Sequence, residues 1–452
     1  MARLNILKLG YLESALRTHE GGAARRVSPE LQLRRSVLAC MLWEDQFYED
    51  GVAIAGRIAE LVPKGEAERV AAMAVEAREA MKLRHAPLLL VREMARHKTH
   101  RGRVAETLAR VIQRADELAE FVAIYWQNGR APLSAQVKKG LAAAFTKFDE
   151  YGLAKYDRAG PVKLRDVLFL CHAKPRDAAQ AALWKRLIAG ELTPPDTWEV
   201  ALSSSADKRE SWERLLAERK LGELALLRNL RNMKDAGVRE ELVLDAVRDM
   251  KTDRVLPFRF IGAARYAPQW EEALEQAMFA CVAGQSHPGQ ETAGIEHPKL
   301  GGKTILLVDV SGSMVAPLSR RSEMMRTDAA YGLAVLLREI CEQVSVYSFS
   351  NELKRIAPRR GFALRDAIEA SQAHLGTYLG KALGEIDESY DRMIVITDEQ
   401  AHDSVPSPRA PGYMINVASY KNGVGYGKWT HIDGWCESVI EYIRELERAS
   451  LN

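Results

Sequence analysis

Long apolar runs are absent from this 452-residue sequence: the two longest, Val37–Trp43 and Ala277–Ala283, have seven residues each. A helix that crosses a bilayer needs about 20 apolar residues, so we expect neither a membrane span nor a membrane partner. The first ten residues also lack the sustained apolar core of a secretory signal peptide. Together these absences predict a cytoplasmic protein.

Cysteine is also scarce. The five cysteines lie at least 60 positions apart, and no two of them form a Cys-x-x-Cys pair. This spacing predicts no disulfide framework and no cysteine-bound zinc, as is usual in a reducing compartment.

Neither sign of charge dominates the chain, whose formal net charge is +3 at pH 7. Residues 1–300 hold 47 Lys and Arg against 41 Asp and Glu, a balance of +6, whereas residues 301–452 hold 17 against 20, a balance of −3. The 49 residues from Lys138 to Arg186 hold 11 basic and five acidic residues, again +6. Such a stretch is typical of a surface that binds a polyanion, although a solvated lysine-rich face would give the same count.

From the N-terminus to about residue 285 the sequence predicts helix after helix. Apolar residues at helical spacing from Leu108 to Trp126 predict one buried helix, which the Asn128-Gly129 pair would end. Helical hairpins in series bury their apolar faces by stacking on one another. Residues 1–285 are therefore expected to form a HEAT-like repeat array, with about seven units of roughly 40 residues. A compact helical bundle is the alternative.

A segment rich in glycine, proline and polar residues, 286–303, is expected to link this array to a second domain, 304–452. Apolar runs without alternation there predict parallel strands that are covered on both faces. The expected fold of this domain is an open, doubly wound α/β sheet. Its expected strands are 304–310, 344–349, 393–397 and 413–418, and its expected helices are 323–342, 362–373, 378–389 and 434–448.

The sequence Asp309-Val-Ser311-Gly-Ser313 directly follows the first expected strand of this domain. Short oxygen-bearing side chains at alternate positions can converge at the carboxyl end of a strand, where open α/β sheets bind ligands. Thr377 and Asp398, near the ends of later elements, would supply two further oxygens. Carboxylate and hydroxyl oxygens suit Mg²⁺, so these five residues are candidate metal ligands. The alternative is that the two serines only cap a turn.

This pattern resembles the metal-ion-dependent adhesion site of von Willebrand factor A domains. There, Asp-x-Ser-x-Ser, a threonine of a second loop and an aspartate of a third loop hold Mg²⁺ or Mn²⁺, which implies the same roles for the five residues just named. The family often has Gly-Gly-Thr-Asp at the second loop, whereas this sequence has Leu375-Gly-Thr377-Tyr378. A partner's carboxylate typically completes the coordination in such domains, which implies binding without catalysis.

The helix expected around residues 164–171 would present a mixed polar and aromatic face. Arg165, Phe169 and His172 stand at positions i, i+4 and i+7, on one side of the helix. A cation, an aromatic ring and an imidazole can pair with phosphates and stack on the bases of single-stranded or loop RNA. Phe169 could equally be a core residue, and His172 could equally cap the helix end. The expected buried stripe of this helix is Leu164, Val167, Leu168 and Cys171.

Five segments, 147–158, 162–175, 197–203, 227–233 and 256–260, resemble the TROVE module of the Ro autoantigen family. In that family a ring of HEAT-like repeats is closed by a C-terminal von Willebrand factor A domain. The resemblance implies a monomeric, noncatalytic ring that binds a small noncoding Y-like RNA on its outer basic surface. It also implies a central cavity for single-stranded 3′ ends of misfolded or structured RNA, and a scaffold role in RNA quality control that delivers RNA to an exoribonuclease.

The candidate RNA-binding residues have three sources. The basic stretch supplies Lys138, Lys139, Lys147, Lys163 and Lys174. The resemblance implies contacts with Y RNA for Lys155, Tyr156, Arg158, Arg165 and His172. Arg228, Arg231 and Asn232, at i, i+3 and i+4 of another expected helix, are candidates for the cavity wall, with a solvated outer face as the alternative.

Two other functions are compatible with the sequence. Asp309 and Asp398 could belong to a Mg²⁺-dependent RNA-processing enzyme. Two-metal chemistry usually needs more converging carboxylates, and only Asp328, Glu399 and Asp403 lie near them in the sequence. The metal domain could instead be a protein-interaction adaptor for which RNA is incidental.

Overall fold

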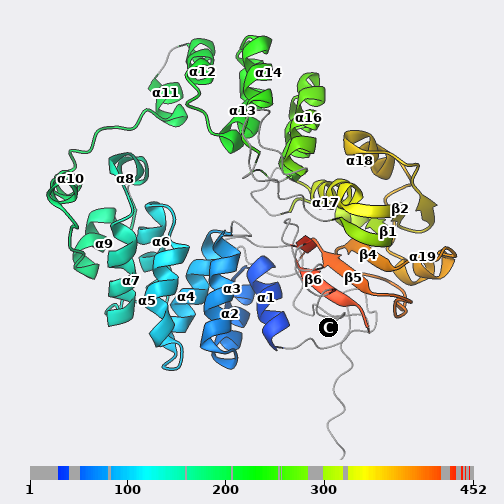
Figure 1. Ribbon diagram of the computed structural model, residues 1–452, viewed down its shortest axis with the longest axis horizontal. Helices are drawn as coiled ribbons and strands as arrows, with labels where there is room; N and C mark the ends of the chain where they lie inside the picture. The colour runs from blue at the N-terminus through cyan, green and yellow to red at the C-terminus, as the bar shows by residue number, and fades with distance from the viewer. Residues whose placement is uncertain are drawn as a thin grey trace, which may run out of the picture. The chain divides into compact units, whose positions relative to one another are not determined.

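The computed structural model describes residues 29–39, 51–79, 83–157, 160–204, 207–252, 255, 257–282, 299–318, 324–418 and 428–433, with a few positions between 439 and 447. The described positions within 29–282 form a helical unit, and those within 299–433 form an α/β unit (Figure 1). The predicted fold class, a helical part followed by an α/β sheet, is confirmed.

Hairpins of short helices build the helical unit. Its helices are α1 (Pro29–Ala39), α2 (Gly51–Leu61), α3 (Ala67–Glu79), α4 (His85–Arg96), α5 (Arg101–Val111), α6 (Asp116–Tyr125), α7 (Ala135–Phe145), α8 (Glu150–Tyr156), α9 (Leu164–Cys171), α10 (Ala178–Ala189), α11 (Trp198–Ser204), α12 (Lys208–Ala217), α13 (Glu223–Asp235), α14 (Glu240–Arg248), α15 (Pro257–Tyr266) and α16 (Glu271–Val282). Helices two apart in chain order pack together: α3 on α5, α5 on α7, α7 on α9, α12 on α14, and α14 on α16. Each hairpin thus covers the apolar face of the next, as in a repeat array.

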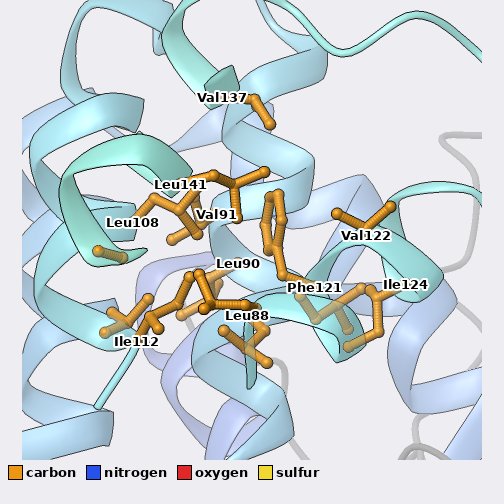
Figure 2. Packing of buried hydrophobic residues seen from close by; sticks show 14 of the residues in the cluster. Leu88, Leu90, Val91, Leu108, Ile112, Phe121, Val122, Ile124, Val137 and Leu141 are labelled. Atoms are coloured by element: carbon orange, nitrogen blue, oxygen red, sulfur yellow. The ribbon is translucent and has the colours of Figure 1, made fainter. Parts of the chain in front are cut away.

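A continuous apolar core joins α1 to α10. Figure 2 shows the part of it between α4 and α7. Leu88 and Leu90 of α4 are fully buried in it, as are Leu108 of α5, Phe121 of α6 and Leu141 of α7. Burying one such side chain contributes about 1.5–3 kcal/mol. The core therefore fixes which face of each helix remains outside.

Helices α5 and α7 approach closely at Gly140. A Cβ atom at this position would lie 2.9 Å from the carbonyl oxygen of Ala105 and 2.9 Å from the Cβ of Leu108. The absence of a side chain therefore sets the spacing of the two hairpins, directly beside Lys139.

Residues 108–126 do not form the single helix that their apolar spacing predicts, because residues 112–115 separate α5 from α6. The Oε2 atom of Glu117 accepts hydrogen bonds from the backbone N–H groups of Gln113 and Arg114, at 2.8 and 3.0 Å. This carboxylate thus holds the connection between α5 and α6, whose N–H groups have no partner within a helix. The apolar spacing continues across the break because both helices face the same core.

The α/β unit is built on a six-stranded sheet with the order β3-β2-β1-β4-β5-β6. Its strands are β1 (Leu300–Asp309), β2 (Cys341–Phe349), β3 (Leu353–Arg355), β4 (Arg392–Thr397), β5 (Gly412–Asn416) and β6 (Thr430–Asp433). All neighbouring strands are parallel except β3, which is antiparallel to β2. The sheet therefore has the predicted parallel centre with one antiparallel edge.

Helices cover both faces of this sheet. Leu379 and Leu383 of α19 (Leu379–Glu385) pack against Ile305 and Leu307 of β1. Helix α17 (Arg326–Ile340) contacts β1, β2 and β4 but contributes nothing to that cluster, so it covers the opposite face, where α18 (Gly361–Glu369) packs against it. Loops follow the carboxyl ends of β1 and β4, where Asp309 and Asp398 lie.

Four features of the α/β unit differ from the sequence-based expectation. Strands β1 and β2 begin at Leu300 and Cys341, inside the segments expected to be a linker and a helix, and β3 and β6 were not expected at all. β3 has three residues and two of them are charged, so it carries no apolar signal. The remaining expected linker, 286–298, the expected helix 434–448, except for four positions, and Arg158 lie outside the described residues.

Replacement of Glu117 by glutamine should destabilise the helical unit. Glu117 is fully buried, and its Oε1 atom accepts a 2.7 Å hydrogen bond from the buried Arg78. Removing one partner of a buried ion pair leaves the other charge uncompensated, so the free energy of unfolding should fall by about 3 kcal/mol in urea denaturation. The control is Glu79→Gln, because Glu79 pairs with Arg110 at the surface; equal losses in both variants would contradict this role of Glu117.

Candidate nucleic-acid interface and metal site

The basic residues of the helical unit differ in whether a carboxylate neutralises them. On α5, Arg103 pairs with Glu68 at 2.8 Å and Arg110 pairs with Glu79 at 2.8 Å. Seven predicted RNA-binding cations of the stretch 138–174 make no ion pair within 4.0 Å with any described carboxylate: Lys138, Lys139, Lys147, Lys155, Lys163, Arg165 and Lys174. The carboxyl of Asp157 lies close enough for Lys163 and Arg165 to act on it, but forms no such pair. We refer to the surface of residues 138–174 as the basic face, because these cations are not neutralised by ion pairs.

Helix α9 exposes the predicted mixed face. Its stripe Leu164, Val167, Leu168 and Cys171 is buried, as predicted, while Arg165 and His172 are exposed. Phe169 lies between them in the helix sequence and is 58% exposed, so the alternative that it belongs to the core is wrong. His172 ends the helix in the left-handed conformation, at φ 53°. An exposed phenyl ring flanked by a cation and an imidazole is a suitable platform for base stacking.

A second aromatic group adjoins this face at α8. The Lys155 ammonium lies 5.5 Å from the ring centre of Tyr151 and 5.7 Å from that of Tyr156. Arg114 covers the Tyr156 ring at 4.6 Å, so this ring is held in place by cation–π contacts. Tyr151 is 52% exposed and was missed in the sequence analysis. Its position four residues before Lys155 on a helix could have identified it.

Lys147 has a different environment from the other predicted RNA-binding lysines. Its Nζ donates hydrogen bonds to the carbonyl oxygens of Ala109 and Ile112, the latter at 3.0 Å. These carbonyls lie at the C-terminus of α5, where unpaired acceptors and the helix dipole favour a cation. Lys147 thus caps α5 in this structure.

The candidate cavity-wall residues share the solvent-exposed face of α13. Arg228, Arg231 and Asn232 are all exposed, and Asn232 donates a 2.9 Å hydrogen bond to Asn229. Arg259 lies on α15, which packs against α13. It belongs to segment 256–260 of the TROVE resemblance, but it was not among the candidate RNA-binding residues. Burial, followed by the nearby charge of Arg228, lowers the pKa of Arg259. The structure therefore brings at least two arginines together on α13 and α15.

Four of the five candidate metal ligands of the α/β unit lie at the carboxyl ends of β1 and β4: Asp309, Ser311, Ser313 and Asp398. Asp309 is fully buried: its Oδ1 accepts a 2.8 Å hydrogen bond from the Ser311 N–H, and its Oδ2 accepts a 2.6 Å bond from the Thr397 hydroxyl. The hydroxyls of Ser311 and Ser313 lie 3.3 Å apart. Burial, and then the charge of Asp398, raise the pKa of Asp309 to about 7. Two carboxylates are thus held close together out of water.

The loop that carries Thr377 joins the same edge of the sheet. The Gly312 N–H donates a 2.8 Å hydrogen bond to the carbonyl of Leu375, and His374 Nδ1 lies 2.6 Å from the carbonyl of Val310. Thr377 is buried, and its carbonyl accepts a 2.9 Å bond from the His402 N–H. The backbone bonds therefore fix the second loop beside the Asp-x-Ser-x-Ser loop.

Tyr378 stands where von Willebrand factor A domains often have aspartate. Its ring stacks on His402, with centres 5.4 Å apart. Asp403 accepts hydrogen bonds from the N–H groups of Gly380 and Lys381 at 2.9 and 2.7 Å. A carboxylate from another loop thus binds the first turn of α19, although residue 378 has none.

The donor set fits a hard divalent cation. It combines carboxylates with hydroxyls, the oxygen ligands that Mg²⁺ and Mn²⁺ accept. Within the described part of the chain, no group of three or more His, Cys, Asp or Glu side chains could hold a metal. The serine and threonine hydroxyls are therefore necessary to any metal site at this edge.

Comparison with known proteins identifies part of the helical unit. Residues 176–292 match the TROVE domain. Telomerase protein component 1 of Mus musculus and of Rattus norvegicus are 38% and 37% identical to this chain over 89 residues, which is 18% of the chain but 3% of each relative. The Ro (Rsr) protein of Deinococcus radiodurans has a similar fold, with a TM-score of 0.60 at 18% identity, covering 91% of this chain and 98% of that one.

These findings confirm the resemblance to TROVE and Ro proteins. Three of the five segments that carry it, 197–203, 227–233 and 256–260, lie within the matched residues 176–292. The basic face, from Lys138 to Lys174, precedes residues 176–292 and is not part of the TROVE match. For this stretch the comparison with the Ro protein shows a similar fold. As for membranes, the helices among the described residues are all too short or too polar to cross a bilayer.

Asp309→Asn should remove a pH dependence of stability from the metal-free protein. Because the pKa of this carboxyl is about 7 in the folded protein and ordinarily 3.8, its contribution is complete below about pH 4 and is lost as the pH rises through 7. The parent protein should therefore lose roughly 2 kcal/mol between pH 5.5 and 8, as measured by urea denaturation in EDTA. Asp366→Asn, at an exposed carboxylate, is the control and should keep the loss; a loss that persists in Asp309→Asn would contradict this assignment.

Proposed function

We propose that this protein is a noncatalytic RNA-binding protein that holds structured RNA on the basic face formed by α7, α8 and α9. The observation that carries the proposal is the exposed Phe169 beside Arg165, on a face whose other cations lack carboxylate partners. Uncompensated cations attract the phosphate backbone, and exposed aromatic rings stack on bases. The similarity to TROVE and Ro proteins, which are RNA-binding, supports the same conclusion.

The finer proposal follows the family more closely. A small noncoding Y-like RNA would bind the basic face, and single-stranded 3′ ends of misfolded or structured RNA would bind in a central cavity at Arg228, Arg231 and Asn232. Arg259 beside Arg228 supports a phosphate contact at that second place. The protein would then be a scaffold in RNA quality control that delivers RNA to an exoribonuclease.

For the α/β unit we propose a Mg²⁺ or Mn²⁺ site that binds a partner protein. Asp309, Ser311, Ser313, Thr377 and Asp398 would hold the cation, which would supply a positive charge for a partner's carboxylate. Three large apolar side chains are exposed in the described α/β unit, and all lie on two of the three loops that carry these ligands: Val315, Leu375 and Tyr378. Exposed apolar groups beside a charged site favour protein docking over hydrolysis of RNA.

Removal of the positive charge and the ring from α9 should weaken RNA binding. In the variant Arg165→Ala/Phe169→Ala/Lys174→Ala, the dissociation constant for a labelled RNA hairpin should rise at least tenfold. The slope of log affinity against log salt should also fall by roughly 1–2, because two phosphate contacts are lost. Fluorescence anisotropy between 50 and 200 mM salt measures both quantities.

The matched control is Arg103→Ala/Arg110→Ala, which removes two exposed cations of the same unit that are already paired with carboxylates. Equal weakening in both variants would mean that net charge alone, not this face, binds RNA. Incubation of the protein with labelled RNA and Mg²⁺ addresses the alternative of an enzyme. Metal-dependent cleavage that Asp309→Ala abolishes would refute the noncatalytic proposal.

A further inference from the structure

An arginine lies inside the candidate metal site. Arg326, the first residue of α17, is 3% exposed. Its Nη1 donates hydrogen bonds to the carbonyl of Ser313 at 3.0 Å and to Oδ2 of Asp398 at 3.4 Å. One guanidinium nitrogen therefore bridges the loop after β1 and the loop after β4, which carry four of the five candidate ligands.

The backbone holds Arg326 in this position independently of its charge. Its N–H donates a 2.9 Å bond to the carbonyl of Ala316, and Pro317 forms a β-bridge with Met325. The segment after Ser313 is thereby tied to the start of α17. The guanidinium thus reaches Asp398 from a fixed anchor.

Three buried charged groups contribute to the electrostatic balance of the site. Asp309 and Asp398 are fully buried and repel one another, while Arg326 supplies one opposite charge at Asp398. Buried charges interact strongly because little water screens them. Without metal, the guanidinium offsets part of the repulsion. With a metal bound, two cations would share Asp398 and repel each other.

We propose that Arg326 is a built-in counter-ion of the cation site. It keeps the ligand loops together when no metal is bound, and it lowers the affinity of the site for divalent cations. The inference rests on the proposed metal site and adds a property to it. Occupancy becomes reversible and responsive to the cation concentration, because the folded loops do not need the metal to stay in place.

The test compares Arg326→Gln, which can still donate a hydrogen bond but has no charge, with Arg326→Lys, which keeps the charge. Calorimetric titration with MnCl₂ at pH 7.5 should show at least tenfold tighter binding by Arg326→Gln than by the parent protein, and binding within about threefold of the parent by Arg326→Lys. In EDTA the Tm of Arg326→Gln should be lower than that of the parent protein. The control, Arg360→Gln, removes an exposed arginine of the same unit that pairs with Glu339 and should change neither quantity.

The outcomes separate this inference from the proposed site. If the parent protein binds Mn²⁺ and Arg326→Gln binds it equally or more weakly, the counter-ion role is overturned while the metal site remains. If neither binds Mn²⁺, both proposals are overturned.

A second comparison covers the case in which Arg326→Gln does not fold in EDTA. The double variant Arg326→Gln/Asp398→Asn lacks both charges, so it should regain folding or a higher Tm relative to Arg326→Gln. No recovery would overturn the counter-ion role.

Discussion

Each helix of residues 29–282 can bury its apolar stripe only against neighbouring hairpins, and this constraint determines which side chains meet solvent. The core-facing stripe of α9 is Leu164, Val167, Leu168 and Cys171. Arg165 and Phe169 lie on the other side of the helix and therefore face solvent. The exposed phenyl ring is thus a direct consequence of stacking. An aromatic ring left in water gains no burial free energy on folding, so its exposure follows from the stacking and not from its own stability.

The distribution of ion pairs explains why the cations of α7 to α9 are not neutralised. On α3 and α5, glutamates at the facing positions neutralise the arginines, so that surface presents alternating charge. On α7 to α9 the acidic residues are used elsewhere: Asp149 and Asp177 accept backbone hydrogen bonds at the starts of α8 and α10, and Glu150 pairs with Arg186. The cations of this stretch therefore remain available, although its net charge alone could not distinguish this case from a solvated face.

Sequence predicted the type and order of elements well, because period and apolar runs report burial directly. It predicted one helix for residues 108–126, since the break that Glu117 holds is a matter of hydrogen bonding and leaves the apolar period intact. It also missed β3 and β6, which are short and partly polar. Lys147 was selected as an RNA-binding candidate because of its charge. Its hydrogen bond to the C-terminus of α5 joins residues 35 positions apart, so the local sequence could not predict it.

At the predicted metal site, too, some residues could be selected from the sequence and others could not. Motif spacing was sufficient to select Asp309, Ser311 and Asp398 at neighbouring strand ends, because parallel topology brings these ends together. Arg326 could not be selected, since an arginine at the start of a helix is ordinarily a surface residue. Its burial and its contact with Asp398 appear only in the structure.

Each unit holds charges of one sign close together, but the cations of α7 to α9 are exposed to water whereas the carboxylates of the α/β unit are buried. On α7 to α9 the cations lie in water, where salt screens charges separated by more than about 8–10 Å, so their mutual repulsion is small and a polyanion can replace the counterions. In the α/β unit the carboxylates are dry, and their repulsion must be offset within the fold or by a bound cation. In the structure Arg326 lies beside Asp398 and supplies one opposite charge, while backbone hydrogen bonds hold these loops in place.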